Sequence, residues 1–320
     1  MKTRVLLFFV LALWLPSTPA LAQRVGDSGA SSVPVRASGG GTLESFSFPD
    51  PDASLQRGLE RVLARAPFRD LVRQGALSVA LIDLSDPEHV RYAGYDEDHM
   101  RYAASLPKIG ILLGVFDQVE KGELEYTPEL RRDLELMIRN SSNQKSSELI
   151  RRVGFQTIAN VLQEPRYQLY SQARNGGIWV GRGYGGMGLW RRDPIAQLSH
   201  GATARQVARF MVMMDQGLLI SPWASAEMKD IMGEPAIHHK FVAGLDARPG
   251  SRIYRKSGTW SRWHADAALV ERDGKKYVAV GLLETERNPG YLRDLIVSLD
   301  DLVFRPSASP RVVGSSNEER

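Results

Sequence analysis

The chain has 320 residues, of which 43% are hydrophobic and 24% charged, and it carries a formal net charge of +4. This is enough apolar material for a large core in one domain of two lobes or in two domains, and the charged fraction is ordinary for a globular protein. Cysteine is absent, which excludes disulfides, thiol chemistry and thiolate metal sites, and the scattered basic residues give no support to nucleic-acid binding.

Residues 1–22 have the pattern of a cleaved secretory signal. Lys2 and Arg4 precede the apolar run VLLFFVLALWL, and small residues lead to Ala22. The run is too short to span a bilayer comfortably, although a retained N-terminal anchor is the alternative. We therefore expect an exported protein, periplasmic or secreted after cleavage near Ala22, without stable membrane insertion.

The remaining segments divide the chain into a linker, one domain and a tail. Residues 23–50 are rich in Gly, Ser and Pro and lack an apolar period, which predicts a flexible linker. The domain is expected over residues 51–306, and residues 307–320 are expected to be a disordered C-terminal tail.

Within the domain, hydrophobic periodicity predicts helices at both ends and between two groups of strands. In chain order these are a helix over 54–66, a strand hairpin over 76–84 and 89–96, helices from 101 to about 170, loops over 175–194, a helix over 202–219, strands over 252–260 and 265–284 with a tight turn at RDGK, and a helix over 291–304. This order predicts an α/β (α+β) fold, with an antiparallel sheet flanked by helices and an all-helical lobe. The sheet must be assembled from both ends of the chain.

Ser105 and Lys108 stand at the start of a helix that is apolar nearly all round. Their spacing places both side chains on one face, and Pro107 is tolerated in a first turn. A serine at a helix N-terminus gains from the helix dipole when an oxyanion forms beside it. A lysine in a partly dry site loses its proton more easily, so Lys108 could activate the Ser105 hydroxyl.

Ser-x-x-Lys alone is weak evidence, because Ser142 and Lys145 repeat it. Two further segments add to it: Ser141-Ser142-Asn143 before a helix, and Lys256-Ser257-Gly258 at the end of a strand. A hydroxyl can pass a proton to a leaving nitrogen, an amide can hold a carbonyl, and an ammonium can hold a carboxylate. Alone, each segment would equally suit a helix cap or a strand-end lysine.

Together, the ordered Ser-x-x-Lys, Ser-x-Asn and Lys-Ser-Gly boxes resemble the signature of the penicillin-recognising serine enzymes, which include class A β-lactamases and penicillin-binding proteins. The similarity covers roughly residues 54–304 and implies the β-lactamase/transpeptidase-like fold. It implies that Ser105 is the acylated nucleophile, Lys108 its base and Ser141 the proton shuttle. Asn143, Lys256, Ser257, Gly258 and Thr259 are implied to bind substrate, with the amides of Ser105 and Thr259 as the oxyanion hole.

Two departures from the family pattern stand out. Ser142 replaces the usual acid of the second box, and a register with Ser142 as the shuttle is possible, although Ser141 aligns without a gap. Class A β-lactamases also carry a water-activating glutamate in the loop before the helix at 202–219, and no glutamate occurs from Pro165 to Ala226. Asp193 and Glu164 are the weak candidates for that role.

Three other features have simpler interpretations. The glycines of GYGGMG at 183–188 match a dinucleotide loop but lack its strand and helix. Adjacent His238 and His239 face apart in a helix or strand, so no metal site is expected. His264 is expected to pack or line the site.

We therefore expect a monomeric serine hydrolase that needs no cofactor and forms an acyl-enzyme at Ser105 with β-lactams or D-alanyl peptides. A DD-peptidase of the penicillin-binding type and a serine esterase are the alternatives within the same chemistry. A non-catalytic cell-wall binding module is the alternative of another class.

Overall fold

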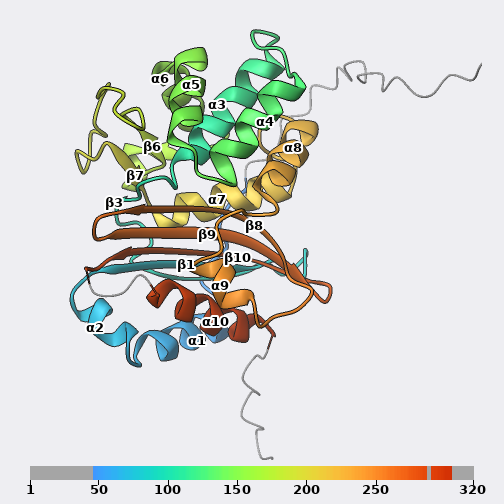
Figure 1. Ribbon diagram of the computed structural model, residues 1–320. Coiled ribbons are helices and arrows are strands. Elements are labelled where there is room, and N and C mark those ends of the chain that lie inside the picture. The colour runs from blue at the N-terminus through green and yellow to red at the C-terminus, as the bar shows by residue number, and fades with distance from the viewer. Residues whose placement is uncertain (1–45, 287–289, 305–320) are drawn as a thin grey trace, which may run out of the picture. The chain divides into compact units, whose positions relative to one another are not determined.

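The computed structural model describes residues 46–286 and 290–304 (Figure 1). The predicted signal at 1–22, the predicted tail at 307–320 and most of the predicted linker lie outside these ranges, so the domain limits stay predictions. The last five residues of the linker region, 46–50, are described. There Phe48 packs edge-on against Tyr92, with ring centroids 5.0 Å apart.

A five-stranded antiparallel sheet lies at the centre of the fold, in the order β2-β1-β10-β9-β8. Its strands are β1 (Leu77–Asp83), β2 (Arg91–Tyr95), β8 (Arg252–Trp260), β9 (Trp263–Arg272) and β10 (Lys275–Glu284). The hairpin near the N-terminus and the three C-terminal strands are as the sequence predicts. Strand β1 joins them by pairing with β10, from Leu77 opposite Leu283 to Asp83 opposite Tyr277.

Helices cover both faces of this sheet (Figure 1). Below it lie α1 (Ala53–Leu63), α2 (Phe68–Arg73), α9 (Phe241–Leu245) and α10 (Tyr291–Phe304). Above it lie α3 (Lys108–Glu120), α4 (Pro128–Ile138), α5 (Asn143–Val153), α6 (Phe155–Gln163), α7 (Ala204–Asp215) and α8 (Pro222–Met232). The predicted α+β class, with a helical lobe on one face, is confirmed.

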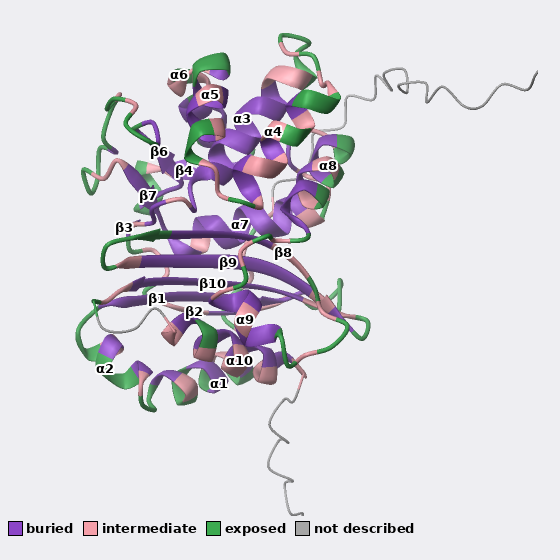
Figure 2. Cartoon of the chain, in the orientation of Figure 1, coloured by how far each residue is buried: buried purple, intermediate pink, exposed green. Residues whose placement is uncertain are grey.

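The alternation of side chains along the strands divides the core into two layers. On β10, Tyr277 and Ala279 face the layer of α1 and α10, whereas Val278 and Val280 face the helical lobe. This is the period of two that a strand imposes. Because both faces are covered, the strands are buried along most of their length (Figure 2).

Helix α3 forms the centre of the helical lobe, and all its residues from Lys108 to Asp117 are buried. Helix α1 (Ala53–Leu63), by contrast, buries one face and exposes the other, as its amphipathic pattern predicts. Glycines allow close helix contacts in the lobe, since a Cβ added at Gly114 would lie 2.9 Å from a side-chain carbon of Ile158. Helix α3 is therefore packed closely against α6.

A second, small sheet lies beside the start of α3, in the order β3-β7-β6. Its strands are β3 (Arg101–Tyr102), β6 (Trp179–Val180) and β7 (His200–Ala202). It brings the segment before Ser105 next to the loop region at 175–194. Within the described residues, none of the helices combines the length and apolar character needed to span a bilayer.

Candidate active site

Ser105 lies in a tight turn between β3 and α3. Two backbone hydrogen bonds form the turn, from Leu106 N to Ala103 O at 3.0 Å and from Lys108 N to Ser105 O at 3.3 Å. Ala104 adopts φ 50°, a left-handed conformation that costs energy for a residue with a side chain. Ser105 is half-buried, and its hydroxyl has no hydrogen-bond partner within the described part of the chain. The hydroxyl is thus presented by a rigid turn and left available.

Lys108 begins α3, one turn after Ser105, and its side chain is fully buried. Its Nζ donates to Ser141 O at 2.7 Å and to Asn143 Oδ1 at 2.9 Å. Burial lowers the pKa of Lys108 to about 7, because removing an ammonium from water disfavours its charged form. The lysine therefore gives up its proton more readily than a lysine in water does.

Ser141 connects this lysine to the third box. Its Oγ lies 2.9 Å from Lys256 Nζ and 3.5 Å from Lys108 Nζ, and its backbone has φ 56°. A hydroxyl can accept two hydrogen bonds and donate one. With both nitrogens donating, the Ser141 proton is free to point elsewhere.

Ser142 has a different position, as the N-cap of α5. Its Oγ accepts from Lys145 N at 3.2 Å, and Lys145 forms ion pairs with Asp133 and Glu148, both at 2.9 Å. The second Ser-x-x-Lys copy is thus a helix cap and a surface lysine. The structure places Ser141 beside Lys108 and Lys256, whereas Ser142 caps helix α5.

Lys256 is buried on β8, and its Nζ also donates to Ser257 O at 2.7 Å. Burial, reinforced by the nearby Lys108 cation, lowers the pKa of Lys256 well below its usual value. Ser257 is itself buried beside it. The two lysines thus approach one hydroxyl from two sides.

Gly258 places the end of β8 directly against the nucleophile turn. A Cβ built on Gly258 would lie 2.1 Å from Ala103 O and 2.7 Å from Ser105 N. Only glycine allows this approach between two backbones. The third box is therefore adjacent to Ser105, as the family resemblance implies.

Thr259 follows and is held from below by Lys240, a residue that sequence reasoning missed. Lys240 Nζ donates to Thr259 Oγ1 at 2.7 Å and to Gly258 O at 2.6 Å. Burial lowers the pKa of Lys240 to about 8. No motif marks Lys240, because it becomes part of the site only through the packing of α9 under β8 and β9.

Tyr184 is the second residue that sequence reasoning missed. Its buried ring lies under Lys108 Nζ, 4.5 Å from the ring centroid, and its hydroxyl donates to Ala104 O at 3.3 Å. The ring of His200 packs against Tyr184 at a tilt of 38°, with centroids 4.4 Å apart, and burial lowers the pKa of His200 to about 4. A neutral aromatic pair therefore fills the side of Lys108 that faces the loop.

Asp193 and Glu164 are both engaged away from the nucleophile. The buried Asp193 carboxylate accepts from the backbone amides of Ile195, Ala196 and Leu198 at 2.6–3.0 Å. Glu164 pairs with Arg166 at 2.7 Å. Among the described residues, no carboxylate hydrogen bonds to the Ser105 hydroxyl or to Lys108.

The remaining motif residues lie in structural positions. Residues 183–188 form a loop closed by a bridge between Arg182 and Leu189, and no helix follows it. Tyr184, which lies within that motif, is the residue through which the motif contributes to the site. His239 lies 3.4 Å from Arg255, and His264 is buried opposite Thr259 on the neighbouring strand.

Comparisons with known proteins identify the family and the fold. A model described as the β-lactamase enzyme family matches residues 63–133 and 125–304. A β-lactamase from Sphaerobacter thermophilus superposes with a TM-score of 0.61 at 15% identity, over 79% of this chain and 98% of that one. The protein PBP-A superposes with a TM-score of 0.59 at 21% identity, over 82% and 99%.

A further β-lactamase, from Chitinophaga pinensis, gives a TM-score of 0.59 at 16% identity, over 78% and 97% of the two chains. At these identities the likeness shows the fold, which is that of the β-lactamases. A search of curated proteins found no match.

Proposed function

Because the chain belongs to the β-lactamase enzyme family, we propose that it is a serine hydrolase whose Ser105 is acylated by β-lactams and related D-alanyl amides. One observation carries this proposal: a buried lysine, Lys108, with a pKa lowered to about 7, lies one turn from an unpartnered serine and contacts Ser141 and Asn143. A non-catalytic binding module would not need a buried lysine and a serine arranged in this way.

In the acylation step, neutral Lys108 takes the Ser105 proton while Oγ forms a bond to the substrate carbonyl carbon. The backbone amides of Ser105 and Thr259 hold the resulting oxyanion. Ser141 gives its proton to the leaving nitrogen as the carbon–nitrogen bond breaks, and the Lys108 ammonium replaces that proton on Ser141. Asn143 accepts from Lys108 through Oδ1, which leaves its amide nitrogen for the substrate.

The rate of deacylation distinguishes the two leading candidates, a β-lactamase and a penicillin-binding peptidase. Water must be activated to release the acyl group, and the described structure puts the Tyr184 ring, not a carboxylate, beside Lys108. This favours an ester with β-lactams that is released slowly, as in a penicillin-binding peptidase. PBP-A, which shares the fold, has been captured as an acyl-enzyme with penicillin G in a variant form.

Intact-protein mass spectrometry during incubation with a penicillin tests the proposal, with Ser105→Ala as control. Drug consumption far beyond one equivalent would support a β-lactamase. A single stable adduct, absent from the control, would support the peptidase alternative. No adduct and no turnover would overturn acylation by β-lactams and leave the esterase to be tested with activated esters.

We also propose that the protein is exported, on the basis of the signal-like residues 1–22. The mass of the protein recovered from the cell envelope or the medium tests this. Cleavage near Ala22 is expected, whereas a full-length mass would contradict it.

A further inference from the structure

A cavity of about 490 Å³ lies at the end of β3, the strand that leads into the nucleophile turn. Its walls include Tyr102 at the end of β3, and Trp260 and Trp263 at the tip of the β8–β9 hairpin. Tyr102 packs on Trp263 with ring centroids 5.2 Å apart. The cavity therefore has an aromatic wall built from two segments that lie far apart in the sequence.

The direction of β8 shows which part of a substrate this cavity would receive. Lys256 on β8 faces Ser141, Gly258 touches the backbone of Ser105, and Trp260 comes two residues later. A strand advances about 3.3 Å per residue, so Lys256 and Trp260 lie on opposite sides of Ser105. Since Ser141 protonates the leaving nitrogen in the proposed mechanism, the acyl part of the substrate points toward Trp260.

Two arginines give this cavity a positive charge. Arg182 and Arg192 line it and are both exposed. Arg192 donates to the Gln197 carbonyl at 2.8 Å, and within the described residues neither guanidinium is paired with a carboxylate. Glu284, also in the lining, is paired with Arg262.

A larger cavity of about 1030 Å³ lies between α4, α8 and the segment before β8. It differs in the pairing of the arginines that line it. Its arginines are compensated: Arg131 pairs with Glu227 at 2.5 Å, and Arg248 pairs with Asp300 at 3.1 Å. Guanidinium groups that have no carboxylate partner among the described residues are thus a feature of the smaller cavity, which also has aromatic walls.

We propose that Arg182 and Arg192 select acyl donors whose side chain ends in a carboxylate, which binds in this cavity while its apolar part lies against Tyr102, Trp260 and Trp263. Guanidinium groups bind carboxylates through charge-assisted, often bidentate hydrogen bonds. The inference rests on the proposed function, because it concerns the acyl part of the same substrate.

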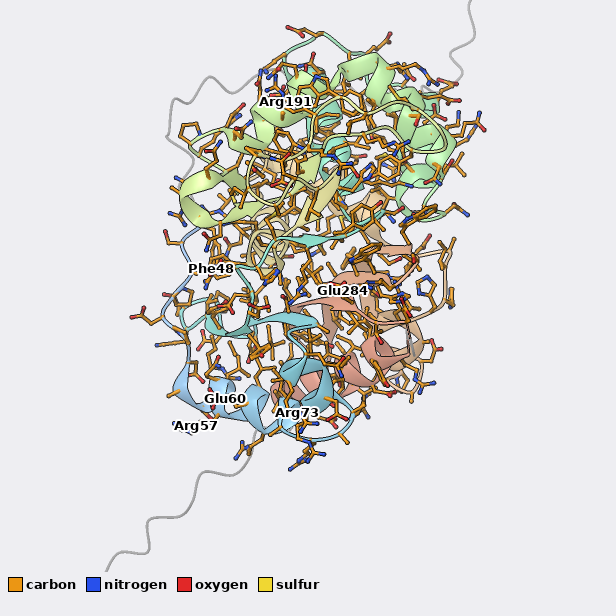
Figure 3. All side chains as sticks on the ribbon, turned by 90° about the vertical axis from the view of Figure 1, so that its left-hand side faces the viewer. Phe48, Arg57, Glu60, Arg73, Arg191 and Glu284 are labelled. Carbon is orange, nitrogen blue, oxygen red and sulfur yellow. The ribbon has the colours of Figure 1, made fainter. Side chains whose placement is uncertain are left out.

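Arg191 provides a matched control. It precedes Arg192 and is also exposed, but its guanidinium stacks on Trp190 at 5.2 Å and it does not line the cavity. Figure 3 shows Arg191 on the loop above, with Glu284 at the end of β10 in the sheet below. Removing Arg191 changes the net charge equally without changing the cavity.

The test compares two penicillins that are identical except for the end of the acyl side chain, a carboxylate in one and a primary amide in the other. Second-order acylation rates are measured by intact-protein mass spectrometry for the wild type, Arg182→Gln, Arg192→Gln, the double variant and Arg191→Gln. The wild type is expected to prefer the carboxylate by about tenfold, as a well-placed charged hydrogen bond allows. The preference should fall toward one in the double variant and persist in Arg191→Gln.

Arg191→Gln should acylate with both donors at the wild-type rates, and a thermal unfolding temperature equal to that of the wild type shows that the other variants are folded. Equal rates for both donors in the wild type, or a preference that survives the double substitution, would overturn the inference while leaving acylation at Ser105 intact. Absence of both adduct and turnover with either penicillin would overturn the proposed function and this inference with it.

Discussion

Lys256 Nζ lies 2.9 Å from Ser141 Oγ, and Lys108 Nζ approaches the same oxygen to 3.5 Å. Two lysines from segments far apart in the sequence therefore share one serine hydroxyl. Both amines are buried, and the pKa of each is lowered by burial. Which of these three groups holds a proton determines whether the site can take a proton from Ser105 or give one to a leaving group.

Ser141→Ala is expected to slow acylation by unreactive amides by about 10²–10⁴-fold, because a positioned proton donor contributes that much to cleavage. Acylation by an activated thioester should fall far less, since its leaving group needs no proton. The measurement is the acylation rate with both substrates. Ser142→Ala is the control, and should cost about 1 kcal/mol of stability through the lost helix cap with no change in the amide-to-thioester ratio. A selective loss in Ser142→Ala would assign the shuttle to Ser142 instead.

The acylation rate should depend on pH with an apparent pKa near 7. The active form of Lys108 is the neutral amine, and burial lowers its pKa to about 7. The rate should thus fall about tenfold for each pH unit below the pKa and level off above it. A stopped-flow profile from pH 5 to pH 9 with a chromogenic β-lactam checks this. A rate independent of pH over that range would show that Lys108 is not the base.

Gly258→Ala should abolish acylation and lower the free energy of unfolding by about 1–3 kcal/mol, as overpacking does. The new Cβ would lie 2.1 Å from Ala103 O and 2.7 Å from Ser105 N, and backbone atoms cannot move aside as a side chain can. Thermal unfolding and penicillin labelling measure the two effects. Gly188→Ala is the matched control, because its Cβ would meet nothing within 4 Å. Normal labelling of Gly258→Ala would mean that the turn and the strand can separate without loss of function.

Asp193→Asn should destabilise the protein by about 1–3 kcal/mol, because a buried carboxylate that accepts three backbone amides is replaced by a group with one acceptor oxygen. Glu164→Gln should cost no more than about 1 kcal/mol, as expected for an exposed ion pair. Neither should change the lifetime of the acyl-enzyme once the folded fraction is taken into account. A lifetime lengthened by either substitution would identify that residue as the group that activates water.

Much of the fold could be predicted from the sequence because its main elements have clear periods. The alternation in β9 and β10 and the apolar run after Lys108 each determine their element locally. The small sheet of β3, β6 and β7 was not predicted, since strands of two or three residues show no period. It is formed by long-range pairing, as of Arg101 with Ala202.

The residues of the candidate site also divide into those that the sequence predicts and those that it does not. Ser105, Lys108, Ser141 and Lys256 belong to short motifs and could be predicted together once the three boxes were taken in order. Tyr184 and Lys240 could not, because their roles come from the loop and helix that place them beside Lys108 and Thr259. A tyrosine in a glycine-rich loop and a lysine after two histidines carry no local signal of their own.

The pairing of β1 with β10 has a consequence for how the protein comes to be folded. Leu77 meets Leu283, about 200 residues further along the chain, so the central sheet has a high contact order and must close a long loop before its contacts form. A nascent chain that lacks its last three strands has the serine turn but neither Lys256 nor the strand that packs against it. The chain should therefore remain without activity, and open to chaperones and proteases, until its C-terminal quarter has been synthesised.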